Sequence, residues 1–382
     1  MILLTSLSYS GKETESKTFE KKILFFLLFV LFISNILLIY KNPDCPFHVD
    51  YVQYAKSIRA YYEKQIIEGN VNGKYLYIYL MGILLTPFYF FKLNLYDSLV
   101  FITGLFQLLI VYLFYKYTNS IIKTLLMATT LTFLTFLGHA ETVMLGSVFL
   151  LLFFIYRDKP YSEFFIMIAS FIRIDYAIYY LFSRNKTAVI PIAITFLQWL
   201  NYRYFLFSDF GVSDPLAAFL IFVMSFGFYA ALILFIELKE KNLDWVKHIM
   251  IIAFLVFFLK FSSQKVFFFP VILAFMLYEL RQFKYRHWLV ALLLILNVAG
   301  AFTVQYQRAG LCTPKAFYEF TQLHNGISLE IFQPYVEHYG GINQEPYSYN
   351  ITQKCANTTD YFYAEDWRDS QLLFIPQKFC LT

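Results

Sequence analysis

Residues 22–40 of the chain read KILFFLLFVLFISNILLIY, and this stretch decides the fold class. After Lys22 it contains no charged residue. A helix of roughly 20 mainly apolar residues crosses a hydrocarbon core of about 30 Å, so this stretch has the length of a transmembrane helix. It is too long for the apolar core of a secretory signal, and no A-x-A-like cleavage site stands before KNPDCP at 41–46. We therefore interpret it as an uncleaved membrane anchor.

The composition of the whole chain agrees with a membrane protein. Of the 382 residues, 59% are hydrophobic and only 15% are charged, whereas roughly a quarter of the residues of a soluble domain are charged. A water-soluble core cannot hold this much apolar surface. The sequence therefore predicts an all-α polytopic membrane protein with about 11 transmembrane helices. The predicted spans are 22–40, 96–116, 119–137, 141–157, 161–172, 174–183, 187–206, 214–237, 246–261, 266–282 and 288–306.

The orientation of the spans follows from the basic residues. Cytosolic segments of membrane proteins are rich in Lys and Arg. If the N-terminus is cytosolic, the segments on the inner side carry more Lys and Arg than the outer loops, so this orientation is favoured. Spans 161–172 and 174–183 are short and are separated only by Arg173, so they are either two crossings or one broken, tilted helix. The stretch 75–93, YLYIYLMGILLTPFYFFKL, must begin and end outside. We expect a re-entrant or interfacial helix there, interrupted at Gly82 and Pro87.

This topology divides the chain into three parts. They are a cytosolic leader at 1–21, a transmembrane domain at 22–306 whose first outer loop is 41–95, and a small extracytosolic C-terminal cap at 307–382. All four cysteines fall in the first outer loop or the cap, which predicts up to two disulfides on an oxidising face, with three pairings open. The cysteines are Cys45, Cys312, Cys355 and Cys380, and two sequons of the cap begin at Asn350 and Asn357.

The densest group of polar residues lies in the first outer loop, where 43–70 reads PDCPFHVDYVQYAKSIRAYYEKQIIEGN. Asp44, His48 and Asp50 precede a stretch with apolar residues at three- and four-residue steps, which predicts an amphipathic helix. We expect its apolar stripe to lie on the membrane and to hold Asp50 at the boundary between water and lipid. The stripe consists of Tyr51, Tyr54, Ala55, Ile58, Tyr62 and Ile66.

A second polar group lies near the outer ends of the spans. His139 and Glu141 stand in GHAET, Arg173 and Asp175 in SFIRIDYAIYY, and Lys265 in SSQKVFFFP. Ionisable residues at membrane depth cost about 2.5 to 3.5 kcal/mol on insertion scales, and they are usually functional or paired. The structural alternatives are a local salt bridge between Arg173 and Asp175, snorkelling of Lys265 and a hydrogen-bonded structural role for His139.

The order of these segments resembles the GT-C glycosyltransferases, membrane enzymes that use polyprenyl-phosphate sugars, and the mannosyltransferase-like members in particular. FHVDYVQYA and YLYIYLMGILLTP follow the N-terminal anchor, and GHAETVMLGSVFLLLFFIYRDK, FFIMIASFIRIDYAIYYLFSR and SSQKVFFFPVILAFMLYE come later. The resemblance covers most of 22–306 and does not extend to the cap. The acidic pair common in the family's loop is replaced by Asp50-Tyr51, and Lys265 and Phe269-Pro270 stand where an Arg-Tyr pair and a later Pro are common.

The resemblance implies a hexosyltransferase that acts at the extracytosolic face and inverts the anomeric centre. It implies that Asp50, or Asp44 in its place, is the general base on an acceptor hydroxyl, and that Lys265 or Arg173 binds the lipid phosphate. The other substrate-binding candidates are His48, Glu141 and Asp175. Asp44, His48 and Asp50 form a weak ligand set for a divalent cation.

The implied partners are membrane lipid, the lipid-linked sugar donor and a glycan, lipid or protein acceptor, and no nucleic acid. The expected location is a microbial or archaeal plasma membrane. Two other classes stay open, a transporter or lipid flippase and a non-catalytic membrane subunit. A transporter favours paired polar residues near mid-membrane and internal repeats, whereas in this sequence polar residues concentrate at the outer rim.

Overall fold

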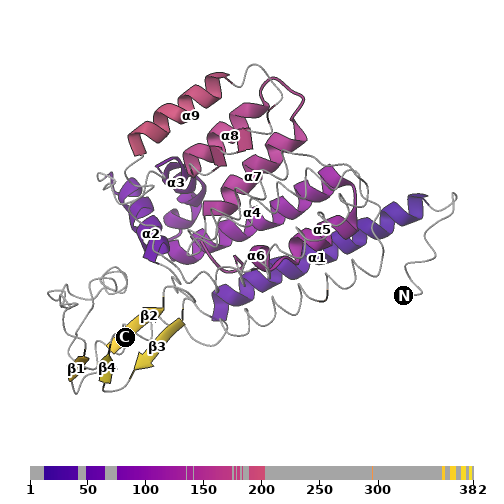
Figure 1. Cartoon of the computed structure of the whole chain (residues 1–382). Helices are drawn as coiled ribbons and strands as arrows, with labels where there is room; N and C mark the ends of the chain where they lie inside the picture. The colour runs from indigo at the N-terminus through magenta and orange to yellow at the C-terminus, as the bar shows by residue number, and fades with distance from the viewer. Residues whose placement is uncertain are drawn as a thin grey trace.

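The structure is a computed structural model, and it describes most of residues 13–202 together with short segments near the C-terminus (Figure 1). The described residues are 13–41, 49–64, 75–134, 136–140, 142–173, 176–177, 179–180, 183, 189–202, 295, 355–357, 362–366, 371–375 and 378–380. The predicted spans 214–237, 246–261 and 266–282 lie outside the described residues, as does all of 288–306 except Ile295.

Within 13–202 the described elements are helical, as the sequence predicts for this part of the chain. The strands of the described residues lie in the predicted cap. The helices are α1 (Glu13–Lys41), α2 (Val49–Tyr62), α3 (Tyr75–Phe90), α4 (Leu95–Thr118), α5 (Ile121–Ala128), α6 (Leu131–Leu134), α7 (Thr142–Ile155), α8 (Ser162–Ile172) and α9 (Val189–Tyr202). The strands are β1 (Cys355–Asn357), β2 (Phe362–Asp366), β3 (Gln371–Ile375) and β4 (Lys378–Cys380).

Helices α1 and α4 are long and apolar enough to cross a membrane, through Lys17–Lys41 and Leu95–Thr118. They run antiparallel. The Tyr115 hydroxyl donates to Glu20 Oε2 at 3.2 Å near one end, and Asn35 Nδ2 donates to Gln107 Oε1 at 3.3 Å farther along. The two helices support membrane association of the chain.

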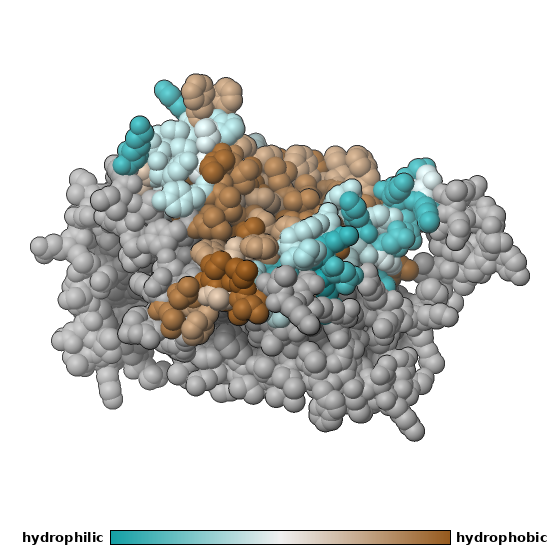
Figure 2. All heavy atoms as spheres, turned by 90° about the horizontal axis from the view of Figure 1, so that it is seen from above, coloured by the Kyte–Doolittle hydropathy of each residue, from teal (hydrophilic) through white to brown (hydrophobic). Residues whose placement is uncertain are grey.

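The surface of the described helices agrees with that association. Figure 2 shows one face of the molecule, on which the hydrophobic residues of the described part lie in the middle and hydrophilic residues lie on either side. Phe25 and Phe26 of α1 are 71% and 66% exposed, and many other large apolar side chains of α1, α3 and α9 are also exposed. Helices that face lipid have such surfaces, because lipid tails are as apolar as these side chains.

The predicted span 119–137 contains two short helices, α5 and α6, in place of one continuous helix. Asn119 ends α4 with a left-handed backbone conformation, and α5 begins two residues later. At the other end of the segment, Gly138 follows α6 and donates its N–H to Asn35 Oδ1 at 3.1 Å. The break falls at Thr129 and Thr130, whose hydroxyls donate to the carbonyls of Leu125 at 2.8 Å and Met127 at 2.9 Å. Such bonds between threonine hydroxyls and backbone carbonyls compete with the regular helix.

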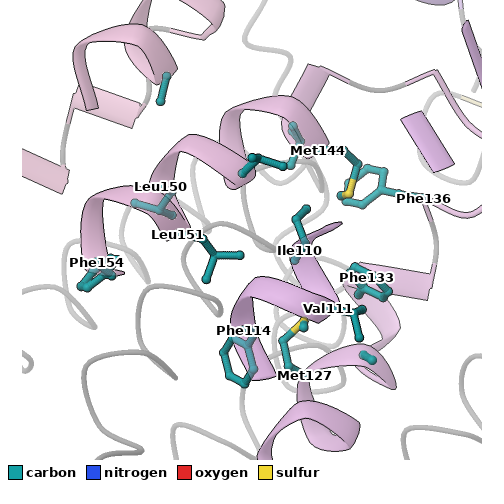
Figure 3. Close-up of a cluster of buried hydrophobic side chains, with 14 of the residues drawn as sticks. Ile110, Val111, Phe114, Met127, Phe133, Phe136, Met144, Leu150, Leu151 and Phe154 are labelled. Carbon is teal, nitrogen blue, oxygen red and sulfur yellow. The ribbon is translucent and has the colours of Figure 1, made fainter. Parts of the chain in front are cut away.

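A core of buried apolar side chains lies between α4, the α5–α6 segment and α7 (Figure 3). Ile110, Val111 and Phe114 of α4 pack against side chains of the α5–α6 segment and of α7. Phe114 and Phe133 are fully buried. The labelled members of this cluster are Ile110, Val111, Phe114, Met127, Phe133, Phe136, Met144, Leu150, Leu151 and Phe154.

The chain reverses direction between the two short predicted spans on either side of Arg173, 161–172 and 174–183. Arg173 Nη1 donates to Thr142 Oγ1 at the start of α7, at 3.4 Å, and Ser183 Oγ donates to Glu163 Oε1 at the start of α8, at 2.5 Å. The chain therefore passes from one end of α8 to the other between Arg173 and Ser183. Its described residues, 176–177 and 179–180, form short 3₁₀ turns. The segment after Arg173 therefore does not continue α8 in the same direction.

Helix α2 forms where the sequence predicts an amphipathic helix, but its described stripe does not lie on lipid. Tyr54 and Ile58 are 1% and 0% exposed, and they belong to a second core cluster with Met81 of α3 and Leu99 of α4. The expectation of a lipid-facing stripe is therefore wrong for these residues. The periodicity of apolar residues predicts a buried face, and it does not distinguish burial against protein from burial against lipid.

Helix α3 is continuous through Gly82 and Pro87, so the expected interruption is also wrong. Gly82 instead allows a close approach of α2, because a Cβ on it would lie 2.7 Å from Tyr61 Cδ1. The Tyr62 hydroxyl donates to the Gly82 carbonyl at 2.5 Å. Pro87 lies in the last turn, so only three residues of α3 follow the position at which its missing N–H removes a helical hydrogen bond.

Candidate functional site

The predicted site residues divide into those that the structure describes and those that it does not. Arg173 is described in full, and Asp50 is the second residue of α2, for which the backbone is described. The candidates that lie outside the described residues are Asp44, His48, Glu141, Asp175 and Lys265.

Arg173 joins the end of α8 to the start of α7. Its backbone is extended, with φ −150° and ψ 121°, and its N–H donates to the Ala169 carbonyl, which ends the helix. Its guanidinium donates to the hydroxyl of Thr142, a fully buried residue. A positive charge at a helix C-terminus also interacts favourably with the helix dipole. These contacts hold a half-buried guanidinium between the end of α8 and the start of α7.

His139 lies in the turn that leads into α7. Its side chain is only 7% exposed, and its backbone N–H donates to the Phe136 carbonyl at 3.2 Å. This burial in a turn favours the structural role over the functional one.

Helix α2 and the Arg173 turn share one hydrophobic cluster. Ala140, just before α7, and Ile172, just before Arg173, pack in the same cluster as Tyr54 of α2. Asp50 precedes Tyr54 by four residues, about one helical turn or roughly 6 Å along the axis. Helix α2 and Ile172, the neighbour of Arg173, thus belong to one cluster that also contains residues of α3 and α4, although they are more than a hundred residues apart in the sequence.

The same end of the molecule holds a buried pair of amides that the sequence analysis missed. Asn35 and Gln107 are 3% and 0% exposed, and they are joined by the 3.3 Å bond between their side chains. Asn35 also donates to the Leu31 carbonyl at 3.0 Å and accepts from Gly138. The signal was present in the sequence, because each amide interrupts a long apolar run. Amides in a membrane helix need such partners.

A buried carboxylate at the opposite end of α8 was also missed. Glu163 is 1% exposed, and it accepts hydrogen bonds from Ser162 Oγ at 3.0 Å and from Ser183 Oγ. Since Ser183 follows the Arg173 turn by ten residues, Glu163 anchors the returning segment. We assign it a structural role, because both bonded hydroxyls belong to that anchor.

The described residues include one acidic and one basic member of the predicted site, Asp50 and Arg173. A carboxylate such as Asp50 accepts a proton from a hydroxyl, and a guanidinium such as Arg173 binds a phosphate through several donors. Among the described residues, no group of three His, Cys, Asp or Glu is placed to hold a metal ion. Most of the weak ligand set Asp44, His48 and Asp50 lies outside that part of the chain.

Comparison with family models, with curated proteins and with solved structures gives no match to this chain. The case for a function therefore rests on the residues and their arrangement.

Proposed function

We propose that the chain is a membrane glycosyltransferase that moves a sugar from a polyprenyl-phosphate donor to an acceptor hydroxyl at the extracytosolic face, with inversion. The observation that carries this proposal is the shared cluster that joins α2, with Asp50 at its start, to the turn at Arg173. A base and a phosphate-binding cation at one end of a lipid-facing helix bundle suit a water-soluble acceptor and a lipid-linked donor.

The position of this end relative to the membrane supports the extracytosolic face. Gly138, close to the Arg173 turn in the fold, packs against Leu38 near the end of α1, where a Cβ on Gly138 would lie 3.1 Å from Leu38 Cβ. The start of α1 carries Lys17, Lys21 and Lys22, all exposed. Since basic residues favour the cytosolic side, the Arg173 end is assigned to the opposite side.

The order of the helices supports the same assignment. Helices α2 and α3 lie between the two long helices α1 and α4, as the resemblance to GT-C enzymes implies for the first outer loop. The exposed side of α3 is apolar, with Ile83 and Phe90 at 60% and 82% exposure. An apolar surface beside the site gives the isoprenoid chain of a lipid donor a place to lie while its phosphate reaches the cation.

In the proposed reaction, the Asp50 carboxylate takes the proton of the acceptor hydroxyl as its oxygen attacks the anomeric carbon. The bond from that carbon to the phosphate oxygen breaks, and its electron pair leaves with the polyprenyl phosphate. Arg173, together with Lys265, stabilises the negative charge that develops on the leaving phosphate. Attack from the side opposite the phosphate inverts the anomeric centre.

The test is release of polyprenyl phosphate from labelled polyprenyl-phosphate sugars by the purified protein in lipid. We expect Asp50→Asn to reduce the rate by about 100-fold or more, because a positioned general base contributes about 10²–10⁴-fold. Glu63→Gln is the matched control, since it makes the same chemical change at an exposed carboxylate just beyond α2.

If the parent releases no polyprenyl phosphate from any donor, the transferase proposal is wrong. Vesicle uptake or lipid scrambling by the same preparation would then identify a transporter or flippase, and inactivity in both assays would leave the non-catalytic subunit. Equal loss in Asp50→Asn and Glu63→Gln would refute the role of Asp50.

A further inference from the structure

The four strands that the structure describes in the cap form two nested antiparallel pairs. Strands β2 and β3 pair with each other, from Phe362 opposite Ile375 to Asp366 opposite Gln371. Strands β1 and β4 pair around them, with Cys355 directly opposite Cys380. The register thus places two of the four cysteines at facing positions.

Facing positions of an antiparallel pair meet the distance requirement of a disulfide. Directly opposite residues have Cα atoms roughly 4.5 or 5.5 Å apart, and disulfides join Cα atoms about 4.4 to 6.8 Å apart. A shift of one residue would place Cys355 opposite Phe379 in place of Cys380. The register therefore distinguishes between the three pairings that the sequence leaves open.

We propose that Cys355 and Cys380 form a disulfide that closes the nested hairpins, which leaves Cys45 and Cys312 as the remaining pair. The inference rests on the extracytosolic position of the cap under the proposed function, and it does not depend on transferase activity. In its formation the two thiols lose two protons and two electrons and gain one sulfur–sulfur bond. An extracytosolic thiol–disulfide oxidoreductase accepts the electrons, and its own disulfide is reduced to a dithiol.

The sequence allows a direct test by peptide mapping. Cells are treated with N-ethylmaleimide, and the unreduced full chain is purified, deglycosylated and cut with trypsin. Cleavage after Lys354, Arg368 and Lys378 gives the peptides CANTTDYFYAEDWR at 355–368 and FCLT at 379–382. We expect these two peptides to be linked to each other and to separate on reduction. Deglycosylation is included because the sequon at Asn357 lies in the first peptide.

Two variants test the pairing independently. In Cys45→Ser/Cys312→Ser the linked peptides should persist, whereas in Cys355→Ser the Cys380 peptide should carry N-ethylmaleimide. Modification of Cys355 and Cys380 in the parent, or a link from either to Cys45 or Cys312, would overturn the proposal.

A second measurement tests separately the register of β1 and β4 and the extracytosolic position of the cap, on which the inference rests. The parent is purified, reduced and exposed to oxidised glutathione, and the same peptides are mapped. If the link forms here but not in cells, the native disulfide is refuted and the error lies in the side of the membrane assigned to the cap. If it forms in neither, the register is wrong. Neither arm uses a sugar donor, so failure of the transferase proposal would leave both results unaffected.

Discussion

Replacing Asn35 by leucine should destabilise the protein by about 2 kcal/mol or more. The change keeps the size of the side chain and removes three hydrogen bonds, those to the Leu31 carbonyl, to Gln107 Oε1 and from the Gly138 N–H. Hydrogen bonds within membrane proteins average about 0.6 kcal/mol each in double-mutant cycles, which gives the figure of about 2 kcal/mol. The buried Gln107 amide and Gly138 N–H left without this partner add to the loss.

The measurement is unfolding of the purified protein in mixed micelles by titration with a denaturing detergent, followed by tryptophan fluorescence. Ser34→Ala is the matched control, because among the described residues Ser34 Oγ bonds to the Val30 carbonyl of its own helix alone, at 2.8 Å, and the loss of this bond should change the midpoint little. Asn35→Leu/Gln107→Leu should be less destabilised than the sum of the single variants, since it no longer buries an unpaired amide.

Two outcomes would refute this reasoning. If Asn35→Leu unfolds at the same detergent concentration as Ser34→Ala, the amide pair contributes nothing to stability. If the two leucine substitutions are fully additive, the amides do not interact.

Three further predictions concern the α2–α3 contact and Arg173. Gly82→Ala should lower the free energy of unfolding by about 1–3 kcal/mol, because its Cβ would lie 2.7 Å from the Tyr61 ring. Adding Tyr61→Ala to this variant should recover much of the loss in the same unfolding assay, and no recovery would refute the contact. Burial raises the pKa of the Tyr62 phenol above 10.0, so the folded state holds this proton more tightly than the unfolded state. Stability should therefore fall as the pH rises from about 10 through the raised pKa, and less steeply in Tyr62→Phe; equal slopes would contradict this. Arg173→Gln should raise the KM for a polyprenyl-phosphate donor by about 10-fold, with Arg173→Lys intermediate, whereas an unchanged KM would limit Arg173 to its bond with Thr142.

The long helices could be predicted from the sequence because their signal is local. The predicted spans 22–40 and 96–116 lie inside α1 and α4, and 161–172 differs from α8 by one residue. Hydrophobic length determines such spans, whatever lies next to them. The break at Thr129 and Thr130 could not be predicted in this way, because threonine in an apolar run is compatible with a continuous helix.

What a helix face contacts was harder to predict than the helix itself. The residues Tyr54, Ala55 and Ile58 were correctly grouped on one face, but that face packs on α3 and α4. Gly82 was interpreted as a break because glycine is a poor helix former, and the close approach of Tyr61 depends on tertiary packing. The residue types of the candidate site were visible in the sequence, whereas the cluster that joins α2 to the Arg173 turn required the fold.

The buried amide pair connects these levels of the structure. Asn35 bonds to Gly138, which lies four residues before Thr142, the partner of Arg173. A polar residue inside the first membrane helix thereby helps to fix a turn more than a hundred residues away in the sequence. Polar groups in a membrane helix are costly unless they have partners. The partners of Asn35 are Gln107 of α4 and Gly138, so the contacts that offset this cost also help to position the segment before Thr142, whose hydroxyl accepts a hydrogen bond from the proposed phosphate-binding guanidinium.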